Sequence, residues 1–181
     1  GTHVALWLRS DSTYILQRPL PGSDSVPTGM VGTWSTRGAD LILAGQRPEP
    51  PMRWHAAGDQ LEERRLDGTE YSHGSTTLDK LADDVGDAIP RMRLVGTFIY
   101  YADAQSFKPC GSSYTWPCVG GMDLGEVDGE PLAPFSNIDL QQAYAKAVAK
   151  GGDPWLVEVV CTMGMGPAME GDGADEYIYV E

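Results

Sequence analysis

The sequence predicts an all-β fold organised as two small β-barrel domains. Short apolar or alternating segments recur along its 181 residues and are separated by turn residues, of which Asp67-Gly68 is the clearest pair. An acidic segment without aromatic residues interrupts this rhythm and ends at Pro90. We therefore predict a first domain over residues 1–80, a linker over 81–91 and a second domain over 92–181. A short helix packed on the first barrel is the alternative interpretation of the linker.

The first domain is expected to be a meander of seven strands. Each expected strand is a short run rich in apolar, β-branched or aromatic residues, and the loops between them contain Gly, Pro, Ser or Asp. The expected strands are 4–8, 13–17, 29–35, 40–43, 52–56, 60–64 and 69–78. Residues 46–51 must form a loop, because their prolines cannot donate hydrogen bonds to a neighbouring strand.

The second domain is expected to contain one helix among its strands. Residues 92–110 are interpreted as a strand that enters a tight turn at Cys110, and residues 115–119 as the returning strand. A Gly-, Pro- and acid-rich excursion over 120–135 precedes a helix that Ser136 or Asn137 caps and Gly151-Gly152 ends. Strands at 155–161 and 176–180 complete the domain. This order of elements suits a small barrel of the OB type.

The charge balance narrows the classes of partner. The chain has 13 Lys and Arg residues and 26 Asp and Glu residues, which gives a formal charge of -13. Nucleic acid is not an expected partner, because phosphate contacts need clustered basic residues. An anionic membrane surface is disfavoured for the same reason. No apolar stretch reaches the roughly 20 residues that span a bilayer, so the sequence predicts no membrane-spanning helix.

Two groups of residues, the histidines and the acidic runs, could bind a hard or borderline metal ion. His3, His55 and His73 could combine with carboxylates, although none is close to another in sequence, and strand or surface histidines are the commoner outcome. The acidic runs could bind Ca²⁺ through oxygen ligands, but neither matches an EF-hand and solvated acidic surface is the simpler interpretation. These runs are Asp83-Asp84 with Asp87, and Asp123, Glu126, Asp128 and Glu130. No hydrolase, phosphate-loop or dinucleotide motif is present, so the sequence predicts no cofactor and no enzyme.

One motif resembles a known family. The run from Gly96 to Cys110 reads Gly-x-Phe-x-Tyr-x-Ala-Asp-Ala-x-x-Phe-x-x-Cys, which resembles the opening of the second domain of NlpE-type bacterial envelope lipoproteins. Further agreement comes from segments in family order, namely Asp11-x-Thr13-Tyr14, Gly32-Thr33-Trp34, Leu41-Ile42-Leu43, Ala143-Tyr144 and Pro154-x-Leu156-Val157-Glu158-Val159. The resemblance implies a lipocalin-like first barrel and an OB-like second barrel.

The resemblance also implies a function. It suggests a non-enzymatic protein of the periplasm or cell envelope, concerned with envelope stress or copper resistance, with other envelope proteins as partners. An accessory subunit of a larger envelope complex and a calycin-like carrier of small ligands remain as alternatives. The family's Cys-x-x-Cys pair and lipid-modified cysteine have no counterpart in this chain, which begins after the place expected for them. The resemblance implies that any membrane attachment is through such a lipid anchor upstream of Gly1.

The copper connection directs attention to the sulfur-containing residues. Met163, Met165 and Met169 are spaced for soft Cu(I), although methionine is also an adaptable core residue. Cys118 and Cys161 fall where the family would have ordinary strand residues, and their joint presence suggests a disulfide. Two buried thiols are the alternative. The family pairs the equivalent of Cys110 with a C-terminal cysteine that this chain lacks.

Overall fold

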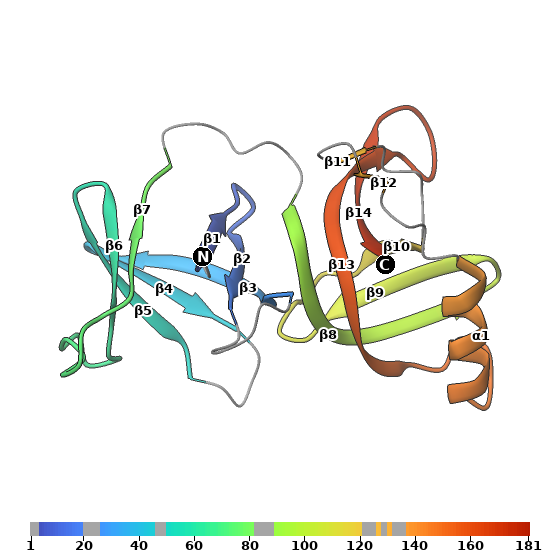
Figure 1. Cartoon of the computed structure of the whole chain (residues 1–181), viewed down its shortest axis with the longest axis horizontal. Helices are drawn as coiled ribbons and strands as arrows, with labels where there is room; N and C mark the ends of the chain where they lie inside the picture. Colours follow the sequence, from blue (N-terminus) through green and yellow to red (C-terminus); the bar gives the residue numbers. More distant parts are fainter. Residues whose placement is uncertain are drawn as a thin grey trace. The chain divides into compact units, whose positions relative to one another are not determined.

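The computed structural model describes residues 4–19, 26–45, 50–81, 89–120, 126–127, 130–131 and 137–181. The chain divides into two compact units, Gly1–Val85 with Cys110–Ser113, and Gly86–Pro109 with Tyr114–Glu181. The described residues form β-strands and a single helix (Figure 1), which confirms the predicted all-β class. The division between Val85 and Gly86 falls within the predicted linker, and the strand that opens the second unit already starts at Ile89.

The first unit is an antiparallel meander in which each strand pairs with the next. Its strands are β1 (Ala5–Leu8), β2 (Thr13–Arg18), β3 (Thr28–Arg37), β4 (Asp40–Ala44), β5 (Met52–Ala57), β6 (Gln60–Arg64) and β7 (Thr77–Asp79). The hydrogen bonds described for this unit run from β1 to β7. A pairing that would join these two edge strands into a closed ring is not among them.

The strand expected at residues 69–78 is reduced to β7. The carboxylate of Asp67 accepts hydrogen bonds from the backbone N–H of Thr69 at 2.9 Å and from its hydroxyl at 2.7 Å. Gly68 has a φ of 90°, which a glycine adopts without strain. This local turn takes the chain away from β6, so a loop fills most of the segment and only its last residues pair with the sheet.

Alternation along the strands builds the core of the first unit. Successive side chains of a strand point to opposite faces, so apolar residues two apart gather on one side. The core cluster consists of Tyr14, Leu16, Leu41, Leu43 and Trp54, none of them more than 5 % exposed. Partly buried apolar side chains of neighbouring strands, including Met30 and Leu61, pack against it. On the opposite face, Asp40 of β4 pairs with His55 of β5, and Arg53 and His55 pair with Arg64 and Glu62 of β6.

The second unit is a closed five-stranded barrel. Its strands are β8 (Ile89–Tyr101), β9 (Ala104–Pro109), β10 (Trp116–Gly120), β13 (Trp155–Pro167) and β14 (Ala174–Val180), and α1 (Asn137–Ala147) lies between β10 and β13 in sequence. The ring runs β8–β9–β10–β14–β13 and returns to β8, with β10 and β14 parallel and the other pairs antiparallel. The two short strands β11 (Glu126–Val127) and β12 (Glu130–Pro131) pair separately. Closure of the ring through one parallel pair confirms the predicted OB-like domain.

The expectation of one strand over residues 92–110 was wrong. The segment is the hairpin of β8 and β9, which turns at Ala102 and Asp103. Both residues have positive φ, 48° and 66°, as the commonest two-residue hairpin turn requires. The hydroxyl of Tyr100 donates a hydrogen bond to the carboxylate of Asp103 at 3.2 Å. Alanine rarely adopts this conformation, so the sequence carries little sign of the turn.

An aromatic cluster fixes the helix to the barrel. The rings of Phe98 and Tyr144 meet edge to face with centroids 5.5 Å apart, and Trp155 contacts both rings. The hydroxyl of Tyr144 donates to the carbonyl of Asp153 at 2.6 Å and accepts from the N–H of Gly152 at 3.0 Å. These bonds tie α1 to the loop before β13. No helix within the described ranges is long and apolar enough to cross a membrane.

Candidate functional site

Cys118 and Cys161, the core cysteines, are both free thiols in the structure, the second of the two arrangements that the sequence left open. Strand β14 lies between their strands, with Cys118 opposite Ile178 and Cys161 opposite Val180. Two strand spacings amount to about 9.5 Å along the sheet, which exceeds the roughly 7 Å that a disulfide allows between α-carbons. Burial raises the pKa of Cys118 to about 12 and also raises the pKa of Cys161. Both therefore stay protonated and behave as small core residues. Cys110 is a free, partly buried thiol.

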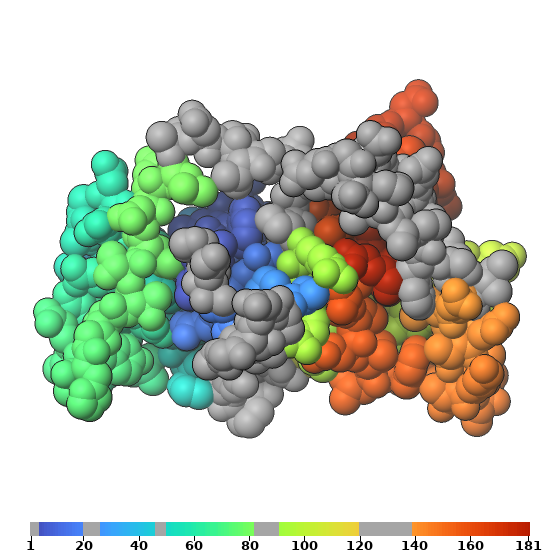
Figure 2. Space-filling view, in the orientation of Figure 1, coloured from blue at the N-terminus to red at the C-terminus, as the bar shows by residue number. Residues whose placement is uncertain are grey.

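The three methionines of the predicted copper site occupy different environments. Met163 is fully buried in the barrel core, whereas Met165 is 51 % exposed and Met169 is 59 % exposed. Met165 lies two residues further along β13, and Met169 lies in the turn between β13 and β14. Figure 2 shows this turn, in red, standing out from the second unit. Only two of the three thioethers are thus accessible without opening the core, and copper binding stays a prediction.

The described histidines belong to separate surroundings. The imidazole Nδ1 of His55 contacts the carboxylate of Asp40 at 2.9 Å, and the guanidinium of Arg53 contacts the other carboxylate oxygen. Hydrogen bonds from His55 and then Arg53 lower the pKa of Asp40. His73 lies in the loop before β7, and His3 is outside the described residues. The described part of the chain contains no group of three His, Cys, Asp or Glu side chains placed to hold a metal ion.

Most of the proposed calcium ligands fall outside the described residues. These are Asp83, Asp84, Asp87, Asp123 and Asp128. Glu126 and Glu130 lie on the paired strands β11 and β12, opposite Pro131 and Val127. The structure therefore adds only this backbone register to the calcium hypothesis.

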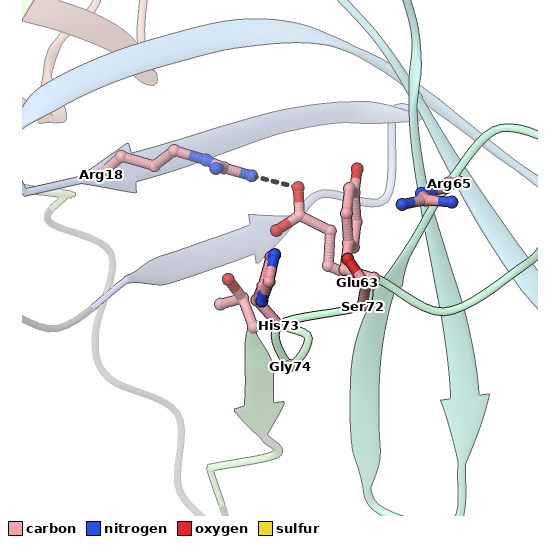
Figure 3. A pocket seen from close by; sticks show the side chains of 8 residues that line it. Arg18, Glu63, Arg65, Ser72, His73 and Gly74 are labelled. Carbon is pink, nitrogen blue, oxygen red and sulfur yellow. Dashed lines mark hydrogen bonds and ion pairs between the residues drawn. The ribbon is translucent and has the colours of Figure 1, made fainter.

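Sequence reasoning missed a pocket in the first unit. Its volume is about 490 Å³, and it is lined by Arg18, Glu63, Arg65, Tyr71, Ser72, His73, Gly74 and Thr76. Figure 3 shows Arg18 and Arg65 on opposite sides, with Glu63 and His73 between them. Arg18 comes from β2 and Glu63 from β6, and their side chains form an ion pair of 2.8 Å. The sequence did carry a weak sign of a basic site in this unit, because residues 1–81 hold eight of the thirteen basic residues but only ten of the 26 acidic ones.

The outer face of the barrel carries exposed apolar side chains. The buried residues Met92, Leu94 and Phe98 alternate along β8 with residues that point outward. Val95 (40 % exposed) and Tyr101 (64 %) point outward from β8. On the neighbouring strand β13, Leu156 (67 %) pairs with Thr97 of β8 and points outward as well. We call Val95, Tyr101 and Leu156 the outer patch. Exposed apolar side chains on one sheet face are candidates for a surface that contacts another protein.

Comparison with known proteins agrees with the closed barrel. The model of the NlpE C-terminal OB domain family matches residues 88–181, just over half of the chain. No curated protein matches the chain. A similar solved structure is the Cpx pathway activator NlpE from Escherichia coli, at 18 % identity and a TM-score of 0.40, over 97 % of this chain and 82 % of that one. The family match covers every strand of the barrel together with α1, so the chain belongs to the NlpE C-terminal OB domain family.

Proposed function

We propose that this chain is a non-catalytic protein of the bacterial cell envelope, of NlpE type, that acts through contacts with other envelope proteins in the response to envelope stress or in copper homeostasis. Family membership over residues 88–181 supports the type of protein. The observation that carries the mode of action is the outer patch. We further propose that the chain reaches the membrane only through a lipid anchor upstream of Gly1.

The structure of the barrel favours its surface over its interior for binding. Phe98, Phe107 and Trp116 are all at most 2 % exposed and pack inside the barrel. Large aromatic side chains thus occupy the space where a ligand would lie. The outer patch, in contrast, keeps its apolar surface in water, which costs free energy that a partner would recover by covering it. Arg93 and Glu158 lie on the same outward face of β8 and β13, with 3.9 Å between their charged groups, and could add polar contacts at its rim.

Replacement of the patch tests the proposal. The double variant Val95→Ser, Leu156→Ser should lose the response of an envelope-stress reporter to overproduction of the full-length protein in its native bacterium. The control is Leu66→Ser, which removes a leucine that is 52 % exposed in a turn of the first unit. The double variant should lower the melting temperature only slightly, because Leu156 is 67 % and Val95 40 % exposed, and the melting curves check that all three proteins are folded. Reporter activation by the double variant at the level of the control would show that the patch is not the signalling surface.

Two further measurements address the alternatives. Light scattering on native extracts would favour an accessory subunit if the chain elutes with a stoichiometric partner. A Cu(I) titration addresses the methionines, since Met163→Leu, Met165→Leu should lower the stoichiometry if they are ligands. Met30→Leu, in the first unit, is the control. An unchanged titration would end the copper hypothesis for this segment.

A further inference from the structure

We propose that the pocket of the first unit binds a small oxyanion, a phosphate or a carboxylate group, between Arg18, Arg65 and His73. This inference concerns the first unit and is independent of the function proposed for the barrel. The fold brings these three side chains together from separate segments of the first unit. Arg18 ends β2, Arg65 follows β6, and His73 lies in the loop that leads to β7.

The pocket carries a net positive charge in a strongly acidic protein. Two guanidinium groups line it against one carboxylate, that of Glu63. This carboxylate already accepts a hydrogen bond from Arg18 Nη2 at 2.8 Å, and its side chain is only 13 % exposed. The negative charge of Glu63 is therefore largely neutralised by Arg18, and its side chain is mostly buried. The second guanidinium, that of Arg65, forms no ion pair with a carboxylate of the described residues, and lies 5.7 Å from the centre of the Tyr71 ring.

The lining also offers more hydrogen-bond donors than acceptors. Arg18 uses Nη2 for Glu63 and for the sulfur of Met52, and its Nε is buried without a partner. The imidazole of His73 and the hydroxyl of Ser72 line the pocket and form no hydrogen bond with another residue that the structure describes. Arginine forks match the planar or tetrahedral oxygens of carboxylates and phosphates. A negatively charged group with several acceptor oxygens thus fits this lining better than a cation or an apolar ligand.

The test is a titration of the full chain with inorganic phosphate and, separately, with acetate, at constant ionic strength set with sodium chloride. Binding is followed by the amide NMR signals of residues 71–76, and a saturable shift is expected with at least one anion. Arg65→Gln should weaken binding about tenfold, which corresponds to 1.4 kcal/mol. Glu63→Gln should tighten it, because it removes the only negative charge in the lining but leaves an oxygen to accept from Arg18.

The control is Arg37→Gln, which removes an exposed arginine of β3 that does not line the pocket. Saturation by phosphate alone identifies a phosphate group as the ligand chemistry, and saturation by acetate identifies a carboxylate. The proposal is overturned if neither anion saturates, if chloride alone produces the same shifts, or if Arg65→Gln binds as tightly as Arg37→Gln.

Discussion

The close approach of β8 and β9 at Gly96 gives a sharp test of the barrel. A β-carbon at this position would lie 2.5 Å from the carbonyl oxygen of Lys108 and 2.5 Å from the ring of Phe107. Ordinary van der Waals contact begins at 3.4 Å, so the Gly96→Ala variant needs a movement of about 1 Å. The oxygen belongs to the backbone of the paired strand, and the ring is fully buried. Neither neighbour can move without disturbing the hairpin or the core.

The expected cost follows from these constraints. Overpacking a core typically costs 1–3 kcal/mol, and a clash with both a backbone and a locked ring places this variant at the upper end, about 3 kcal/mol. With a dependence of about 1.5 kcal/mol per molar urea for a domain of this size, the unfolding midpoint should fall by about 2 M. That shift is far larger than the error of a denaturation curve.

The core cysteines supply an assay that reports on the barrel alone. In a Cys110→Ser background, the core cysteines are the remaining thiols, and both are buried in the second unit. A short pulse of a thiol reagent at each urea concentration labels them only when this unit opens. The labelled fraction therefore gives the unfolding curve of the barrel, whatever the first unit does.

A glycine in open surroundings provides the control. A β-carbon at Gly151 would meet nothing within 4 Å, so Gly151→Ala should leave the free energy of unfolding within about 0.5 kcal/mol of the parent value or raise it slightly. A Gly96→Ala midpoint equal to that of Gly151→Ala would refute the packing of β8 against β9 described here.

Three further predictions concern single interactions. The indole N–H of Trp116 donates a 2.6 Å hydrogen bond to the carboxylate of Glu176. Glu176→Leu should lower the free energy of unfolding by about 1–3 kcal/mol, because it leaves this buried donor unsatisfied. Glu176→Gln keeps an acceptor and should cost less in the same urea assay. Hydrogen bonds from His55 and a neighbouring arginine hold the pKa of Asp40 below its usual 3.8, so this contribution to stability is complete above that pH and is lost as the pH falls through the lowered pKa. Asp40→Asn should make the urea midpoint of the first unit, followed by the amide NMR signals of residues 28–64, less sensitive to pH below 4 than it is in the parent. Alkylation without reductant should modify Cys110 in the folded chain and all three cysteines after unfolding; fewer than three in the unfolded chain would show that a disulfide forms.

Local patterns in the sequence sufficed for the fold class and for most strand positions. The apolar and aromatic residues on both faces of the run from Met92 to Tyr101 predict a strand, and apolar residues at helical spacing between Leu140 and Val148 predict the helix. Both patterns repeat with the period of a strand or a helix, and this period can be read from residues close together in the sequence. The turn at Ala102 and Asp103 was missed because its conformation is imposed by the pairing of β8 with β9 rather than by the local residues.

The candidate sites depended on contacts between distant residues. The sequence identified Cys118 and Cys161 as a pair, but only the order of strands in the barrel placed β14 between them. The pocket of the first unit could not be located from the sequence either, because the register that brings Arg18 to Glu63, 45 residues away, is set by the whole meander. Sequence by itself determined which segments are extended, since that choice is local. Which side chains meet was decided by tertiary structure, because strand order and register are properties of the complete sheet.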